Sequence, residues 1–364
     1  MSDRKYRPVY MFIFMGLMLM VIMMNYSFNL IYYIQNRIYE NAVKTLFPVE
    51  TYFEDNYDEN AGSVWVDSEY MFSMAKEDKK PATQTDEGVV EAGAEVCPLP
   101  IQENAAGNVY NIADLNNYDF LMKFYTVTSI TSLTTQIMRP EEFLAKDLSL
   151  EKNADSPQIL IFHTHSQEKF ADSTDDDSTS ILGVGDYLTE LLTGKGYNVI
   201  HDRSVYDYVD GKLDRSKAYT YAEQGIESIL ESNPSIEVVI DLHRDGVADT
   251  THLVTEVNGR QMAKIMFFNG ISYSNVKGNI NYLYNPYRDD NLALSLQMQL
   301  MGNAYYPGYL RRIYVNAYRY CLHERAKSML IEAGAQTNTF EEVKNAMEPL
   351  ADMLDKLLTG VRAY

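Results

Sequence analysis

Two histidines and a glutamate follow a short apolar run near the middle of the chain. The segment ILIFHTHSQEKF places His163, His165 and Glu168 directly after the apolar residues. The run predicts a buried strand, and open α/β sheets carry their sites where strands end. Imidazole and carboxylate groups are zinc ligands. Because the chain has six histidines in all, two of them one residue apart favour a metal-dependent hydrolase over a hydrogen-bonded structural pair.

Two further apolar runs end in residues of similar chemistry. IEVVIDLHRDG ends with His243, Arg244 and Asp245, and SMLIEAG contains Glu332. Neighbouring parallel strands bring their C-terminal ends to one edge of a sheet, so residues far apart in the sequence can converge there. A carboxylate at the end of an apolar strand is costly to bury unless it has a purpose. The three runs together predict one assembled site.

A hydrolytic zinc needs three protein ligands and one open position for water. We assign His165, Glu168 and His243 as the candidate ligands, and Glu332 as the candidate general base and acid that moves the proton. The structural alternatives are that Glu168 only begins a turn and that His243 is a core histidine paired with a neighbouring aspartate.

The remaining polar residues of these segments have open roles. His163 lies two residues from His165, on the same side of an ideal strand, so spacing alone does not choose the ligand between them. Whichever does not bind metal would orient a ligand or contact substrate. Arg244 and Asp245 are candidate substrate or supporting contacts, or form a salt-bridged turn. The histidines without a comparable context are treated as structural or exposed, and these are His201, His252 and His323.

Strands that alternate with helices must position these residues. The pattern predicts an α/β fold with an open, twisted, mostly parallel sheet flanked by helices. FLMKFYTVTSITSL, residues 120–133, could add an N-terminal strand or extended arm. The expected strands lie within residues 157–162, 198–202, 236–246, 260–270 and 328–338, and the expected helices lie within 181–197, 217–234, 290–308 and 339–358.

The N-terminal region predicts a membrane anchor. No charged residue occurs between Arg7 and Arg37, and about 20 apolar residues suffice to span the hydrocarbon core. Residues 1–36 are therefore expected to hold a transmembrane signal anchor, rather than a cleaved signal peptide, because no small-residue cleavage site follows. Arg4 and Lys5 also precede the apolar segment, so the N-terminus is expected in the cytoplasm and the rest of the chain on the outer, cell-wall side.

An acidic juxtamembrane spacer is expected over residues 37–108 and the catalytic domain over residues 109–364. Runs such as EDNYDEN cannot bury much apolar surface, which suits a tether. The net charge of −20 opposes binding to nucleic acid. Cys97 and Cys321 lie far apart and do not form the pattern of a disulfide framework or a cysteine zinc site.

Several segments in the same order resemble the stage II sporulation protein P family over about residues 111–358. They are FYTVTSIT, ILIFHTHSQEKF, VGDYLTELL followed by GYNVIHD, VVIDLHRDG, YYPGYLRRI and MLIEAGAQTNTFEEVKNAMEPLA. The anchor and the acidic spacer are also typical of that family. YRYCLHER departs from the Tyr-Asn-Gln-like segment of relatives, which affects a substrate-binding role there but not the metal ligands.

The resemblance implies a zinc-dependent N-acetylmuramoyl-L-alanine amidase. Such an enzyme cleaves the peptidoglycan amide between N-acetylmuramic acid and the L-alanine of the stem peptide, and endopeptidase action on cross-links is also attributed to the family. The resemblance further implies a role in engulfment during sporulation, in the mother-cell engulfing membrane, with stage II sporulation proteins D and M. The rival interpretations are a catalytically silent, membrane-tethered wall-binding scaffold and a zinc peptidase that acts on protein.

Overall fold

The computed structural model describes residues 57–58, 63–64, 103–209, 212–213 and 217–364. The expected anchor and nearly all of the expected spacer lie outside these ranges. Within them, no helix has both the length and the apolar character needed to cross a membrane.

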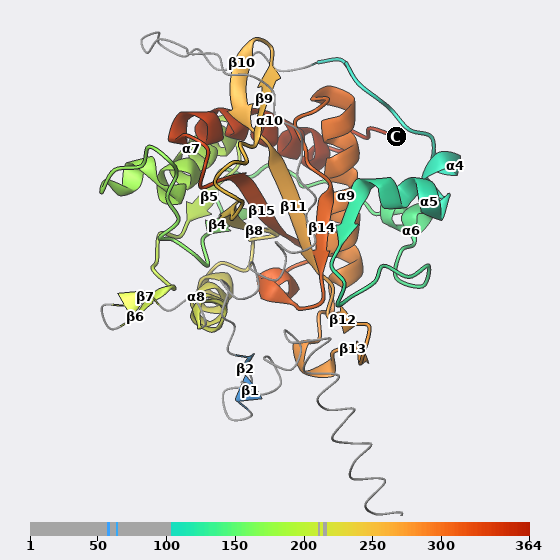
Figure 1. The fold of residues 1–364 in the computed structure, drawn as a ribbon, viewed down its shortest axis with the longest axis horizontal. Helices are drawn as coiled ribbons and strands as arrows, with labels where there is room; N and C mark the ends of the chain where they lie inside the picture. Colours follow the sequence, from blue (N-terminus) through green and yellow to red (C-terminus); the bar gives the residue numbers. More distant parts are fainter. Residues whose placement is uncertain (1–56, 59–62, 65–102, 210–211, 214–216) are drawn as a thin grey trace, which may run out of the picture. The chain divides into compact units, whose positions relative to one another are not determined.

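A seven-stranded sheet forms the centre of the fold, in the order β3-β14-β11-β15-β8-β4-β5 (Figure 1). Its central strands β8, β4, β11 and β15 are buried on both faces, as expected for nearly continuous apolar runs. The bounds are β3 Tyr125–Val127, β14 Ile313–Asn316, β11 Ile265–Gly270, β15 Lys327–Ala335, β8 Val238–Asp245, β4 Ile159–Phe162 and β5 Val199–His201.

The sheet is mixed rather than uniformly directed. β15, β8, β4 and β5 are parallel to one another, and so are β3, β14 and β11, but β11 pairs antiparallel with β15. The predicted mostly parallel pairing is found within each of these two groups of strands. The strand direction reverses where the two groups meet, between β11 and β15. Consequently β4, β8 and β15 end at one edge of the sheet, and β11 ends at the opposite edge.

Helices cover both faces of the sheet. Alternate residues of β4 and β8 point to opposite faces: Ile161 and Ile240 belong to a core cluster that includes residues of α7, α9 and α10, whereas Leu160 and Val239 pack with α8. These helices are α7 Ile181–Gly194, α8 Ala218–Ser232, α9 Arg288–Tyr305 and α10 Phe340–Leu358. All four coincide with helices expected from the sequence.

Smaller elements complete the described part of the chain. The expected strand over residues 260–270 is two strands, because β10 forms a hairpin with β9 and only β11 enters the large sheet. The other elements are α4 Ile112–Leu115, α5 Tyr118–Leu121, α6 Pro140–Ala145, the β9 Val254–Val257 and β10 Arg260–Ala263 hairpin, β1 Tyr57–Asp58 with β2 Ser63–Val64, β6 Tyr208–Val209 with β7 Lys212–Leu213, β12 Tyr273–Ser274 with β13 Gly278–Asn279, and the short 3-10 helices η1 Met122–Phe124, η2 Asp177–Thr179, η3 Asn281–Leu283 and η4 Tyr320–His323.

Candidate metal and catalytic site

The three candidate zinc ligands gather at the edge where β4 and β8 end. Glu168 Oε2 lies 3.7 Å from His243 Nδ1, and the ring centroids of His165 and His243 are 5.3 Å apart. All three residues are buried. The backbone amide of Arg244 donates to Glu168 Oε2 at 2.9 Å, which fixes the carboxylate beside the imidazole of His243. Glu168 therefore does more than begin a turn.

Glu332 lies next to this group because of strand register. In the parallel pair β15–β8 it stands directly opposite His243. Its Oε2 atom is buried and has no hydrogen-bond partner among the described residues. Burial, and then the carboxylate of Asp245, raise the pKa of Glu332 to about 8, although His243 acts in the opposite direction. A carboxyl group with a pKa near neutrality suits a role in accepting and returning a proton.

Asp241 supports His243 from the same face of β8. Its Oδ1 atom lies 2.7 Å from His243 Nε2, and it accepts hydrogen bonds from the amide of Thr164 at 2.9 Å and from the Thr164 hydroxyl at 2.7 Å. Burial lowers the pKa of His243, but Asp241, followed by Glu168 and Glu332, raises it to about 9. Because Nε2 faces Asp241, Nδ1 is the ring atom turned toward Glu168.

His163 and His165 have different surroundings. β4 ends at Phe162, so both histidines lie in the turn beyond it and the alternation of a strand does not apply to them. His163 Nδ1 lies 2.7 Å from the carbonyl of Leu242, and its Nε2 lies 2.8 Å from Nε2 of His201. Burial, and then the charge of His201, hold the pKa of His163 well below its usual value. His163 thus supports the β8 backbone next to His243.

His165 instead faces the elements that cover the other side of the sheet. Its ring packs edge-on against Tyr219 of α8, with centroids 5.7 Å apart, and its Nδ1 atom lies 3.9 Å from Asp207 Oδ2. Together with its proximity to His243, these contacts favour His165 over His163 as the metal ligand.

Arg244 Nη1 donates to the backbone carbonyl of Asp245 at 3.4 Å. The Arg244 Nε atom donates to the carbonyl of Lys169 at 3.1 Å. The carboxylate of Asp245 accepts a hydrogen bond from Arg311 at 2.7 Å. Arg311 therefore compensates the carboxylate that stands close to Glu332.

The donor types of His165, Glu168 and His243 fit zinc, although their ligand atoms do not all lie within 4.8 Å of one another as those of Glu223, His323 and Glu324 do. Two imidazoles and one carboxylate form one of the ligand combinations of hydrolytic zinc sites, and the buried Glu332 carboxylate stands beside them without a hydrogen bond to its Oε2 atom among the described residues. His165, Glu168 and His243 would hold the metal.

A second cluster contains ligand-type residues on α8 and η4. His323 Nε2 lies 2.9 Å from Glu223 Oε1 and 3.1 Å from Glu324 Oε1, and the three groups lie within 4.8 Å of one another. Arg319 also donates to Glu223 Oε1 at 2.5 Å. Because this guanidinium already neutralises a carboxylate and repels cations, the cluster is better described as an ion-pair network. The structural role expected for His323 agrees with this.

The sequence interpretation missed several supporting residues. Asp241 precedes His243 by two residues on one strand, and that spacing could have identified it. Asp207 and Tyr219 come from a loop and a helix whose local sequence gives no metal-site signal. His201, which was expected to be structural or exposed, contacts two other side chains. Its Nε2 atom lies 2.8 Å from His163 Nε2, and its Nδ1 atom lies 2.9 Å from Asp186 Oδ1.

Comparison with known proteins gives relatives of two kinds. The chain is 22% identical over 232 residues to stage II sporulation protein P of Bacillus subtilis (strain 168), covering 58% of this chain and 54% of the relative, so it spans about half of the relative's length. Solved structures that are similar to this chain include the CwlD amidase from Clostridioides difficile in complex with the GerS lipoprotein. The identity is 18% and the TM-score is 0.37, over 56% of this chain and 98% of the amidase chain.

Another is the catalytic domain of CwlV, an N-acetylmuramoyl-L-alanine amidase from Bacillus (Paenibacillus) polymyxa var. colistinus. It is 10% identical, with a TM-score of 0.33 over 55% of this chain and 98% of that one. The model of the family described as stage II sporulation protein P matches residues 49–355, and the chain belongs to this family.

Proposed function

We propose that the protein is a zinc-dependent peptidoglycan hydrolase that cleaves the amide between N-acetylmuramic acid and the L-alanine of the stem peptide. The observation that carries the proposal is the convergence of His165, Glu168 and His243 beside Glu332, whose buried Oε2 atom makes no hydrogen bond within the described structure. Membership of the sporulation family supports peptidoglycan as the substrate.

Each residue of the site has a defined task in this reaction. When bound, zinc polarises the scissile carbonyl and activates water. Glu332 accepts the proton of the attacking water and donates it to the nitrogen of the leaving L-alanine. The carboxylate of Asp241, 2.7 Å from Nε2 of His243, favours a proton on Nε2 and so leaves Nδ1 available, and the Arg244 amide fixes the orientation of Glu168.

Replacement of Glu332 by Gln tests this assignment. The amide keeps the shape of the side chain but cannot accept the proton, so we expect the rate of amide cleavage to fall by roughly 100-fold or more while the zinc content of the purified chain stays stoichiometric. Mass analysis of fragments released from defined muropeptides measures the rate and identifies the bond cleaved. Cleavage at the wild-type rate would exclude Glu332 as the proton carrier.

The same fragment masses separate the related activities. Release of intact stem peptide with L-alanine at its amino terminus indicates the amidase, whereas cleavage within cross-links indicates endopeptidase action. A wild-type chain that releases neither would favour the wall-binding scaffold. The cost of burying the Glu332 carboxylate without a full set of hydrogen bonds favours an enzyme over that scaffold. Cleavage of a protein substrate in place of muropeptides would indicate the zinc peptidase.

The cellular setting is proposed from the sequence and the family. An N-terminal signal anchor with its N-terminus in the cytoplasm would hold the catalytic domain on the cell-wall side of the membrane. Action during engulfment in the mother-cell engulfing membrane, with stage II sporulation proteins D and M as partners, follows from the family resemblance.

A further inference from the structure

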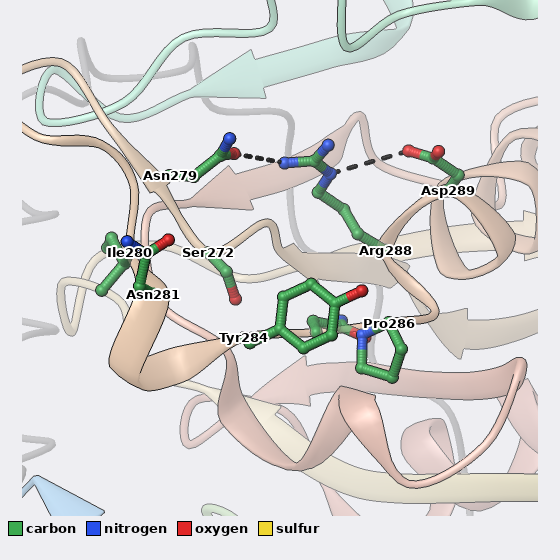
Figure 2. A pocket seen from close by; sticks show the side chains of 9 residues that line it. Ser272, Asn279, Ile280, Asn281, Tyr284, Pro286, Arg288 and Asp289 are labelled. Carbon is green, nitrogen blue, oxygen red and sulfur yellow. Dashed lines mark hydrogen bonds and ion pairs between the residues drawn. The ribbon is translucent and has the colours of Figure 1, made fainter.

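A polar pocket of about 230 Å³ lies between the end of β11 and the start of α9 (Figure 2). Because β11 runs antiparallel to β15, this pocket is at the edge of the sheet opposite to the edge where Glu332 and His243 lie. Its polar and aromatic lining residues are Ser272, Asn279, Asn281, Tyr284, Asn285, Arg288 and Asp289. The proposed hydrolytic site uses none of them.

Ser272 is strained and has an unsatisfied hydroxyl in this pocket. Its φ of 50° lies in the left-handed region, which an ordinary residue adopts only when its surroundings enforce it. The residue is 6% exposed, and its Oγ atom is buried without a hydrogen-bond partner in the described part of the chain. A hydroxyl in that position gains free energy from a ligand that supplies the missing hydrogen bond.

The charges that line the pocket compensate each other. Arg288 donates to the side-chain oxygen of Asn279 at 3.0 Å, and its Nε atom lies 3.6 Å from Asp289 Oδ1 (Figure 2). Asp289 also forms an ion pair with Arg139. A pocket with balanced charge, in a chain of net charge −20, offers little attraction to a phosphate or carboxylate polymer. Its polar lining likewise does not suit an acyl chain. A neutral ligand rich in hydroxyl and amide groups fits these features.

Tyr284 adds an aromatic surface beside those polar groups. The residue is 69% exposed although it lines a pocket, so its ring is available to a ligand. Aromatic rings bury apolar area while nearby polar groups fix the ligand's orientation. A pyranose ring presents the matching surfaces, since its C–H face can cover the phenol ring and its hydroxyl and acetamido groups can reach Ser272 and the asparagines.

We propose that this pocket binds an N-acetylhexosamine unit of the glycan strand, at a point away from the bond that is cut. The inference rests on the proposed function for the identity of the polymer. A second attachment point on the same strand raises the effective concentration of cleavable bonds at the catalytic edge. Long glycan strands would therefore be held more tightly than single muropeptides.

Peptide-free glycan strands, which contain no cleavable amide, test the pocket directly. We expect the full-length chain to bind them and Tyr284→Ala to weaken the binding at least tenfold, as measured by isothermal titration calorimetry. Tyr208→Ala is a matched control, because this tyrosine is 51% exposed and does not line the pocket, and it should bind like the wild type. Ser272→Gly, which removes both the strain and the hydroxyl, should also weaken binding.

Equal binding of the glycan strands by the wild type and by Tyr284→Ala would overturn the proposal. It would also be overturned if the wild type bound an anionic wall polymer more tightly than the glycan strands and Tyr284→Ala abolished the binding of that polymer. Hydrolysis of a disaccharide muropeptide by the wild-type chain tests the proposed function separately. If that substrate is not cleaved but glycan binding depends on Tyr284, the proposed reaction fails and the pocket stands. If it is cleaved and binding does not depend on Tyr284, the pocket fails and the reaction stands.

Discussion

Glu332 and His243 stand directly opposite each other on adjacent parallel strands, so the same backbone ladder positions the candidate proton carrier and a candidate ligand. The sequence allowed both to be selected, because each ends an apolar run with a group that is costly to bury. It did not allow a choice between His163 and His165. That distinction depends on contacts with His201 at the end of the edge strand β5 and with Tyr219 on α8, which packs against one face of the sheet.

The two histidine-containing clusters predict different effects on metal content. His243→Ala removes a candidate ligand, so we expect the purified chain to lose stoichiometric zinc. His323→Ala is the matched control, because His323 belongs to the ion-pair network with Glu223 and Arg319. It should retain zinc. Elemental analysis of both variants measures this, and loss of zinc only in His323→Ala would move the metal site to that network.

We expect Glu324 to make the stability of the fold depend on pH. Burial raises its pKa from 4.5 to about 7, with His323 acting in the opposite direction. Because the folded-state pKa is higher than the unfolded one, the stability associated with the neutral form is present below about pH 4.5 and is lost as the pH rises through about 7. Glu324→Gln should therefore stabilise the protein at pH 8 by about 1–2 kcal/mol.

Thermal unfolding of the wild type and Glu324→Gln at pH 5.5 and pH 8 measures this difference. The gain in melting temperature should be larger at pH 8. A gain that is equal at the two pH values would show that ionisation of Glu324 does not limit stability.

At the scale of elements, α7 must approach the sheet closely for His163 to keep its place. A Cβ atom at Gly185 would lie 2.7 Å from His163 Nε2 and 2.6 Å from His201 Nε2, whereas nothing lies within 4 Å of a Cβ atom at Gly194 of the same helix. Gly185→Ala should cost about 1–3 kcal/mol of stability through overpacking, and it should reduce activity by displacing His163 from the Leu242 carbonyl.

Gly194→Ala serves as the control for helix propensity, since alanine at this open position of the same helix gains up to about 1 kcal/mol. Chemical denaturation of the two variants gives the comparison. If both substitutions stabilise the protein, the close packing of α7 against the two imidazoles is not required for the fold.

Most of the strands and helices, and the parallel pairing of most strands, could be predicted from the sequence, but the antiparallel pairing of β11 with β15 could not. The long buried runs of β8 and β15 and the amphipathic pattern of α7 and α8 are local signals. β14 was not predicted, because its four residues follow Arg311 and Arg312 and show no long apolar run. The antiparallel junction of β11 with β15 depends on tertiary packing, which leaves no periodic pattern in either strand.

For the whole molecule, the predicted anchor has a direct biochemical consequence. The full-length chain should sediment with membranes, resist extraction by high salt and dissolve in detergent, because the predicted anchor would bury about 20 apolar residues in lipid. A chain lacking residues 1–36 is the comparison and should leave the membrane fraction. Release of the full-length chain by salt alone would contradict an anchor that spans the bilayer.

The position of β15 in the sheet affects when the proposed catalytic site is complete. Among the strands that the structure describes it comes last in the sequence, yet it lies between β11 and β8 at the centre of the sheet and supplies Glu332. Contacts between distant parts of a chain form late, after the cost of closing long loops has been met. If the proposed catalytic domain crosses the membrane after its anchor, with residue 109 ahead of residue 364, it would carry its candidate metal ligands before it acquires the candidate proton carrier. The wall beside the site of export would be protected from hydrolysis until the final strand is inserted.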